Sequence, residues 1–327
     1  MERRINTAAW FSAHLFYSNN WNQLLSTTIL EFIDSCKNKY AIKSFFFIRY
    51  FERGPHIRLR FLIESSKDEF CTELLTYFNT FFEKHPSPQP SGKYQNQIQN
   101  NTIHLIDYCP EIERYGGQFG MAISERQFLY SSVAVLAILK TSLDDSYSKL
   151  LGKAIILHIT FAFSMNLKNE RDISTLFKHI FDCWKEFNIY KINDAEQSYN
   201  EKRASLHQKF EERYKNRSAI LKPFCLKLLD DLIDLTKFSE SWLNDWIEGS
   251  GSIYQSLKEV DKQKQLTFTD TAISNVPIVN GIDVSIFILS ESYIHMTNNR
   301  LGLWNEDESF IAYIIFRCFQ DSNGTRL

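Results

Sequence analysis

The stretch Lys43–Glu64, KSFFFIRYFERGPHIRLRFLIE, decides the fold of the N-terminal part of this chain. It contains an aromatic and apolar run, Phe45–Phe51, interrupted only by Arg49, and an alternating segment, His56–Ile63, with Glu-Arg-Gly-Pro between them. Glycine and proline between two runs rich in aromatic and β-branched residues indicate a turn that joins two strands. We therefore predict a β-hairpin here.

The second strand of this hairpin alternates in polarity. Side chains on a strand point to opposite faces with a period of two. Two sets of residues are therefore expected on opposite faces: Ile57, Leu59 and Phe61 toward a core, and His56, Arg58 and Arg60 away from it. By itself, the second set fits either an anion-binding row on a rigid strand or the ordinary solvent face of an edge strand.

Around the hairpin, predicted strands precede predicted helices without regular alternation. This order indicates an α+β fold, with an N-terminal antiparallel sheet packed against a mostly helical C-terminal half. We expect one domain over residues 1–327, strand-rich in 1–120 and helical in 121–327. The 327 residues include 27 Phe and 15 Tyr, enough for a large core.

Caps, periodicity and helix breakers locate individual helices and turns along the chain. Capping boxes at Ser66 and Ser124 predict two helix starts, and one helix is expected over Leu221–Ile247 with Pro223 limiting its start. Gly249–Ser252 is predicted to be a flexible turn, and Asn298–Gly302 a connector between two closing helices.

Charge and cysteine content restrict the class of protein. A net charge of −2 argues against a general nucleic-acid coat, so no direct nucleic-acid partner is expected. The six cysteines form no Cys-x-x-Cys pair, which favours buried thiols over disulfides or a zinc site. We see neither a signal peptide nor an apolar stretch long enough for a membrane span, and expect a cytoplasmic protein without a membrane partner.

Two further segments, besides the hairpin, combine residues suited to chemistry. Glu111–Gly117 carries Arg114 in a loop stiffened by proline and glycine, although Arg114 could equally pair with a neighbouring glutamate in a structural turn. Tyr293–Gly302 carries His295, whose side chain suits proton transfer near neutral pH or the packing of a helix terminus. The usual nucleotide, serine-hydrolase and zinc-protease motifs are missing.

The three segments together resemble a known family. FFFIRYFERGPHIRLRF (Phe45–Phe61), YCPEIERYGG (Tyr108–Gly117) and SYIHMTNNRLG (Ser292–Gly302) occur in the order found in the thiopeptide-type bacteriocin biosynthesis domain. The same domain forms the C-terminal glutamate elimination domain of class I lanthipeptide dehydratases. The resemblance extends from Trp10 to Phe319.

The resemblance implies roles for individual residues. Arg58, Arg60 and Arg114 match positions that hold glutamate, and His295 matches the histidine needed for elimination, so these four are the candidate catalytic residues. The same motifs supply the candidate substrate-binding residues His56, Arg49, Tyr115, Asn299 and Arg300. No metal and no organic cofactor is implied.

The resemblance also leaves several functions open. The expected activity is elimination of glutamate from glutamylated Ser or Thr of a ribosomal precursor peptide, which gives dehydroalanine or dehydrobutyrine. The chain has no room for the glutamylating half, so a separate glutamyl-tRNA-dependent glutamylation protein is the expected partner. The alternatives are a stand-alone pyridine synthase that performs an aza-[4+2] cycloaddition and a non-catalytic peptide-binding subunit.

Overall fold

A computed structural model describes residues 9–92, 94–142, 146–190, 196–269, 272–273, 276 and 283–320. They form two compact units. The sheet unit holds the described residues of Met1–Glu111 and Glu125–Asp144, and the helical unit holds those of Ile112–Ser124 and Asp145–Leu327. The expectation of a single domain over 1–327 stays a prediction.

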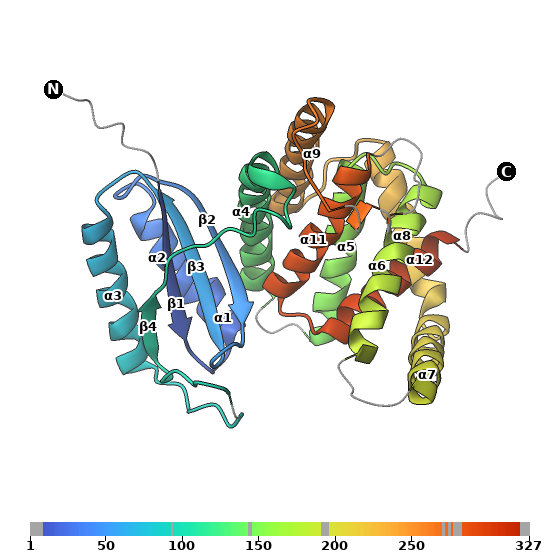
Figure 1. The fold of residues 1–327 in the computed structure, drawn as a ribbon. Coiled ribbons are helices and arrows are strands. Elements are labelled where there is room, and N and C mark those ends of the chain that lie inside the picture. Colours follow the sequence, from blue (N-terminus) through green and yellow to red (C-terminus); the bar gives the residue numbers. More distant parts are fainter. Residues whose placement is uncertain are drawn as a thin grey trace. The chain divides into compact units, whose positions relative to one another are not determined.

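The predicted hairpin and fold class are confirmed. The sheet unit contains a four-stranded antiparallel sheet in the order β2-β3-β1-β4 (Figure 1). Its strands are β1 (Ala9–Phe16), β2 (Ile42–Tyr50), β3 (His56–Ile63) and β4 (Thr102–Leu105). Because the rest of the described chain is mostly helical, the arrangement is α+β.

One face of the sheet is covered by helices from the same unit. They are α1 (Trp21–Leu24), the π-helical turn η1 (Leu25–Ile29), α2 (Leu30–Cys36) and α3 (Lys67–Lys84). Phe32 of α2 and Phe70 of α3 both pack against Phe61 of β3, with ring centroids 6.1 and 5.1 Å away. The predicted cap of α3 is present, because the Ser66 hydroxyl accepts a hydrogen bond from the Glu69 amide.

The helix α4 (Gly117–Thr141) corrects one prediction. Ser124 does not begin a helix but lies within α4, where its hydroxyl donates to the Gly120 carbonyl. The Tyr293 hydroxyl, 2.7 Å from the Ser124 oxygen, satisfies this side chain further. The capping-box pattern was misleading because a tertiary partner, not an orphan backbone amide, satisfies the hydroxyl.

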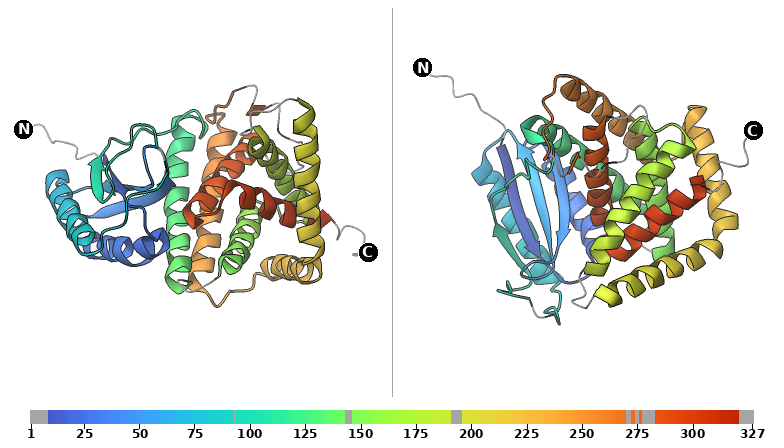
Figure 2. Two further views of the ribbon diagram at one scale, coloured as in Figure 1. Left: turned by 90° about the horizontal axis from the view of Figure 1, so that it is seen from below. Right: turned by 45° about the vertical axis from the view of Figure 1, so that its right-hand side comes forward.

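The helical unit contains seven long helices among the described residues. They are α5 (Tyr147–Ser164), α6 (Glu170–Tyr190), α7 (Glu196–Lys215), α8 (Ser218–Ile233), α9 (Ser241–Lys262), α11 (Val284–Leu301) and α12 (Asn305–Gln320). The helix α5, which is mostly buried from Leu150 to Phe163, contacts α6, α8, α9, α11 and α12. The helices α6 and α12 lie side by side in Figures 1 and 2.

The prediction of one helix over Leu221–Ile247 is wrong, because the chain breaks between α8 and α9. Leu235 adopts a left-handed conformation, and the Asn244 side chain bonds to both the amide and the carbonyl of Phe238. These hydrogen bonds from the Asn244 side chain stabilise a loop at a place where apolar periodicity predicts a helix. Pro223 lies inside α8 rather than limiting its start.

The predicted turn at Gly249–Ser252 is also wrong, since these residues lie within α9. Gly249 and Ser250 are buried, and α9 packs against α5. Near this contact, the Trp246 indole donates to the Leu157 carbonyl of α5 at 3.1 Å. Gly249–Ser252 is therefore regular helix, and its small residues do not mark a turn.

The predicted connector at Asn298–Gly302 is largely helical. The helix α11 continues through Leu301 and ends at Gly302, which has a φ of 82°. Glycine adopts this left-handed conformation without a steric penalty and commonly ends helices. Asn298, Asn299 and Arg300 are therefore helical residues, whereas the sequence placed them in a loop.

Among the described residues, one helix, α4, is long and apolar enough to cross a membrane by length and composition. Its most apolar window is 61% buried, as core helices of soluble proteins often are, so the observation is weak evidence for a span.

Candidate active site

The predicted site residues are divided between the two units. Arg49, His56, Arg58 and Arg60 belong to the sheet unit, and Arg114, Tyr115, His295, Asn299 and Arg300 belong to the helical unit.

In the sheet unit, the basic residues of β3 line a pocket. β3 lies between β2 and β1, so the alternative interpretation as an edge strand is wrong. The pocket has a volume of about 300 Å³, and its lining includes His14, Glu52, His56, Arg58, Arg60 and Asp107. Arg60 is 8% exposed, so the sheet interior holds this guanidinium at a fixed position.

Arg58 and Arg60 are also held by aromatic rings. The Arg58 guanidinium lies 3.5 Å from the ring centroid of Tyr50, and the Arg60 guanidinium lies 4.7 Å from that of Tyr108. The Arg58 guanidinium also lies 3.3 Å from the exposed Glu52 carboxylate. Stacking on rings restricts a guanidinium while leaving its charge able to bind an anion, and a lysine cannot reproduce this planar contact.

His56 differs from the cationic residue that the sequence suggested. Burial lowers its pKa to about 4, with the Gly54 carbonyl opposing and the Arg58 charge assisting this shift. His56 Nδ1 lies 2.8 Å from the Gly54 carbonyl, and Arg58 Nε donates to His56 Nε2 at 3.1 Å. These contacts assign a neutral imidazole with its proton on Nδ1. His56 thus orients Arg58 instead of adding positive charge.

Two further ionisable side chains adjoin the arginines. The His14 ring stacks on the His56 ring at 5.1 Å, and burial, followed by the charge of Arg58, lowers the pKa of His14 to about 3. Burial raises the pKa of Glu125 in α4, while hydrogen bonds from Trp10 and Tyr108 and the charge of Arg60 oppose the rise. The positive charges of this pocket therefore come from Arg58, Arg60 and the exposed Arg53.

Arg49 lies on the opposite face of the sheet from Arg58 and Arg60. In the antiparallel register Arg49 pairs with Ile57, whereas Ile48 pairs with Arg58, and directly paired residues share a face. The Arg49 guanidinium is buried and donates to the Asn22 side chain at 2.8 Å. The structure does not bring Arg49 to the pocket of β3.

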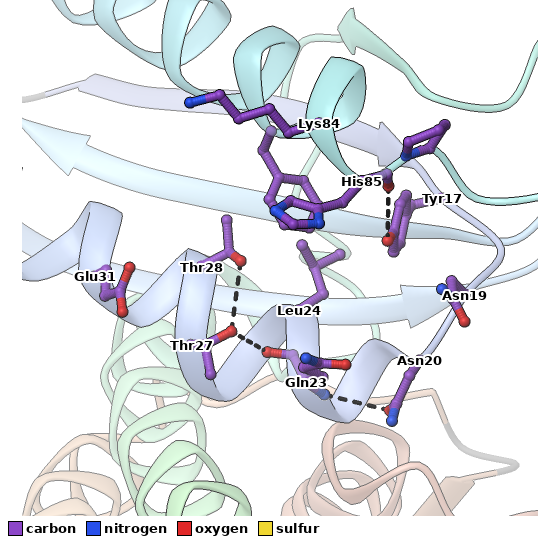
Figure 3. Close-up of a pocket in the computed structure, with 12 residues that line it drawn as sticks. Tyr17, Asn19, Asn20, Gln23, Leu24, Thr27, Thr28, Glu31, Lys84 and His85 are labelled. Atoms are coloured by element: carbon purple, nitrogen blue, oxygen red, sulfur yellow. Dashed lines mark hydrogen bonds between the residues drawn. The ribbon is translucent and has the colours of Figure 1, made fainter.

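A second pocket of about 540 Å³ lies between the α1–η1 segment and the end of α3 (Figure 3). Its labelled side chains include Asn20, Thr27, Thr28 and His85, and the Tyr17 hydroxyl donates to the His85 carbonyl. None of the residues predicted for the active site lines it. It is larger than the β3 pocket, but its lining contains no arginine.

In the helical unit, Arg114 and Tyr115 precede α4 in the predicted rigid loop. The Tyr115 ring is buried and stacks on Tyr293 at 6.2 Å, while Arg114 is exposed and its Nε lies 3.4 Å from the Ser292 hydroxyl. Gly116 has a φ of 77°, and a Cβ at this position would lie 2.8 Å from Phe268. Only glycine fits this turn, which fixes Arg114 beside α11.

His295 projects from α11 one helical turn beyond Ser292. Its Nδ1 lies 2.9 Å from Oε2 of Glu308 on α12, and its ring stacks on Trp184 of α6 at 4.3 Å. The His295 side chain is 21% exposed and that of Glu308 3% exposed. Glu308 therefore fixes one nitrogen of a partly accessible imidazole, as the carboxylate does in serine-hydrolase triads.

Glu308 belongs to a longer buried network. The Asn298 amide donates to Glu308 Oε2 at 3.4 Å, and Nε2 of His158 lies 2.6 Å from Asn298 Oδ1. Burial lowers the pKa of His158 to about 4, so this imidazole is neutral and donates through Nε2. Burial raises the pKa of Glu308, and its bonds to His295 and Asn298 oppose that rise.

The last two predicted residues differ in exposure. Arg300 is fully buried and its Nη1 donates to the Met296 carbonyl, whereas Asn299 is half-buried. Asn299 follows His295 by four residues and so shares its face of α11. Arg300 is a buried residue that stabilises the interior of the helical unit. Of the two residues, Asn299 is the better placed to contact a substrate beside His295.

Sequence reasoning missed Glu308 and Glu125. Glu308 shares an apolar helix stripe with Ile311 and Ile315, and a carboxylate at such a position signals a buried partner. Glu125 was assigned to a capping box, which hid its place beside the basic strand.

With this geometry in hand, the family is established. Residues 10–319 match the family described as lantibiotic biosynthesis dehydratase C-term, and the chain belongs to this family. Over 137 residues it is 28% identical to the epidermin biosynthesis protein EpiB of Staphylococcus epidermidis, covering 42% of this chain but only 13% of EpiB. The chain thus spans a small part of that curated relative.

Solved structures share the fold across nearly the whole chain. The pyridine synthase TbtD from thiomuracin biosynthesis superposes with a TM-score of 0.72 at 14% identity, over 97% of this chain and 99% of TbtD. TsrL gives 0.67 at 15% identity, over 97% and 96% of the two chains. The tRNA-dependent lantibiotic dehydratase MibB from Microbispora sp. 107891 gives 0.59 at 15% identity, with 99% of this chain covering 29% of MibB.

Proposed function

We propose that this protein eliminates glutamate from glutamylated Ser or Thr residues of a ribosomal precursor peptide, yielding dehydroalanine or dehydrobutyrine. The observation that carries the proposal is the pair Arg58 and Arg60, fixed on an interior strand and lining one pocket. Two guanidinium groups in a partly desolvated pocket are suited to a carboxylate-rich group such as glutamate.

The proton transfer is assigned to His295. In a glutamyl ester, a base must remove the Cα proton of the modified residue. The electron pair then forms the Cα–Cβ double bond, and the Cβ–O bond breaks as glutamate leaves. Because His295 Nδ1 is engaged by Glu308, Nε2 is the nitrogen that accepts the proton. The Glu308 carboxylate stabilises the imidazolium that results.

Arginine supplies the electrostatic part of the reaction. Negative charge develops on the peptide carbonyl next to Cα and on the departing carboxylate. We assign the glutamyl carboxylates to Arg58 and Arg60, and charge stabilisation near α11 to Arg114, which lies at Ser292, one turn from His295. Loss of one positioned donor of this kind costs about 100- to 1000-fold in rate.

The proposed partners follow from the substrate. The chain acts as the second half of a split dehydratase, after a separate protein has transferred glutamate from glutamyl-tRNA to the precursor peptide. Both steps are placed in the cytoplasm, where aminoacylated tRNA is available.

A pyridine synthase is the second candidate function. This chain and TbtD cover each other almost completely, whereas MibB is much longer than the matched region. At this level of identity the likeness concerns the fold, so the chemistry has to be decided by substrate. A cycloaddition of two dehydroalanines needs no group that binds glutamate.

One experiment separates the two candidates. The purified protein is incubated with a synthetic peptide carrying glutamyl-Ser and, separately, with a bis-dehydroalanine peptide, and both products are followed by mass spectrometry. Release of glutamate from the first supports elimination. Ring closure of the second without glutamate release overturns it in favour of pyridine formation. Inertness toward both favours a peptide-binding subunit without catalytic activity.

A further inference from the structure

Three side chains of types that can bind a metal meet in the helical unit, outside the proposed active site. His179 and Cys183 lie four residues apart on α6, and Glu291 lies on α11. Residues at this spacing share one face of a helix, as paired metal ligands in helical zinc motifs do. Their ligand atoms all lie within 4.8 Å of one another.

The imidazole–carboxylate distance suits a shared cation better than a direct hydrogen bond, and the imidazole–thiol distance is compatible with either. His179 Nε2 lies 3.6 Å from Cys183 Sγ and 3.5 Å from Glu291 Oε2. A direct bond between an imidazole N–H and a carboxylate is about 2.7–2.9 Å long. Tetrahedral zinc, with bonds of about 2.0–2.3 Å, separates neighbouring ligand atoms by about 3.3–3.6 Å. Both measured separations lie within or next to this range.

The surroundings orient the imidazole while keeping the thiol accessible. The His179 ring packs edge-on against Phe287 of α11 at 5.2 Å, and its side chain is only 12% exposed. Cys183 is exposed, in contrast to the buried thiols expected from the sequence, and it is free. A fixed imidazole beside an exposed thiol and a carboxylate gives an ion a route of entry.

We propose that His179, Cys183 and Glu291 bind one Zn²⁺ ion, which joins α6 to α11. An imidazole, a thiolate and a carboxylate together favour zinc over magnesium or calcium, which prefer oxygen ligands alone. Three protein ligands leave a fourth position for water or another ligand. This proposal is independent of the elimination reaction.

The proposed zinc site lies next to His295, a residue of the proposed active site. Glu291 precedes His295 by four residues on α11, and Cys183 is adjacent to Trp184, whose ring stacks on His295. A metal that holds α6 against α11 would therefore fix the contact between Trp184 and His295. The alternative to a bound Zn²⁺ ion is a protonated His179 imidazole beside Cys183 and Glu291. Burial lowers the pKa of His179, but Cys183 and Glu291 outweigh burial and raise it to about 9.

The test measures metal binding directly. Chelator-treated protein is titrated with Zn²⁺ against a chromophoric chelator, and separately with Co²⁺, whose thiolate complexes absorb in the near ultraviolet. We expect one equivalent of Zn²⁺ per chain and a thiolate-to-cobalt band. Cys183→Ser should abolish that band and weaken Zn²⁺ binding by about 100-fold or more, since even losing a ligand's supporting partner costs about 10- to 100-fold.

Two further variants test whether Zn²⁺ and Co²⁺ bind at this site and not elsewhere on the protein. Cys109→Ser removes another exposed thiol, which lies in the sheet unit, and should change neither measurement. Glu291→Gln should weaken Zn²⁺ binding while circular dichroism stays unchanged. Zinc affinity that is equal in the parent protein and in Cys183→Ser, or a cobalt band that survives in Cys183→Ser, would show adventitious binding and overturn the proposal.

Discussion

His295 Nδ1 and Glu308 Oε2 lie 2.9 Å apart, between the last turns of α11 and the first turn of α12. The carboxylate is almost fully buried and the imidazole is partly open to solvent. The Glu308 carboxylate fixes Nδ1 of His295. In the proposed reaction, Nε2 is the ring nitrogen that faces the substrate. Glu308 is therefore a positioning residue in the proposed reaction.

Glu308→Gln should lower kcat for glutamate elimination by about 100-fold or more and leave KM nearly unchanged, because a neutral amide stabilises an imidazolium poorly. Proton NMR provides a readout that a merely structural role would not move. The far-downfield resonance expected for the His295 Nδ1 proton should disappear in the variant. Glu306→Gln changes an exposed carboxyl in the same helical turn and serves as the control. Equal kcat in both variants would contradict the role of Glu308.

Arg60→Met should raise KM for a glutamylated peptide by about 10- to 100-fold, since a buried guanidinium would no longer meet the glutamyl carboxylate. Arg60→Lys should recover little of this loss, because an ammonium group cannot reproduce the planar contact with Tyr108. Steady-state kinetics of glutamate release provide the measurement. Arg171→Met, at an exposed position of α6, is the control. A KM that is insensitive to residue 60 would remove Arg60 from the site.

Arg49→Met should behave differently, because Arg49 lies on the other face of the sheet and bonds Asn22. We expect the free energy of unfolding to fall by about 1–3 kcal/mol as the hydrogen bonds of a buried charged group are lost. KM and kcat of the folded fraction should stay unchanged. Urea unfolding and kinetics on the same preparation test both expectations, and an increase in KM comparable with that of Arg60→Met would place Arg49 in substrate binding.

The lowered pKa of His158 predicts how the free energy of unfolding depends on pH. Its pKa is lowered from 6.5 to about 4 by burial, so below pH 6.5 the unfolded chain binds a proton that the folded chain does not. Its stabilising contribution is complete above pH 6.5 and is lost as the pH falls through 4. The loss amounts to about 3 kcal/mol.

The measurement compares unfolding free energies at pH 7 and pH 4.5. His158→Gln keeps a donor for Asn298 but does not titrate, so its stability should fall less steeply over this interval than that of the parent protein. His85→Gln, at an exposed position, is the control and should follow the parent. Parallel pH curves for the parent and His158→Gln would show that His158 does not contribute.

Much of the fold could be predicted because its signals are local. The hairpin was predictable because alternation and a Gly-Pro turn specify two strands and the face that each residue occupies. The cap at Ser66 was predictable because it is satisfied within one helical turn. The errors at Ser124, Gly249–Ser252 and Asn298–Gly302 have a common cause. Each involves residues typical of caps and turns that tertiary contacts hold in helices.

By itself, the sequence determined that Arg58 and Arg60 share a face of one strand, because the period of a strand is a property of the backbone. It also supplied His295 and Arg114 as candidates through their motifs. Only the tertiary structure decided that the strand is interior, that His56 is neutral and that Glu308 holds His295. Burial and partners from distant segments set these properties, and sequence periodicity does not specify which helix packs beside which.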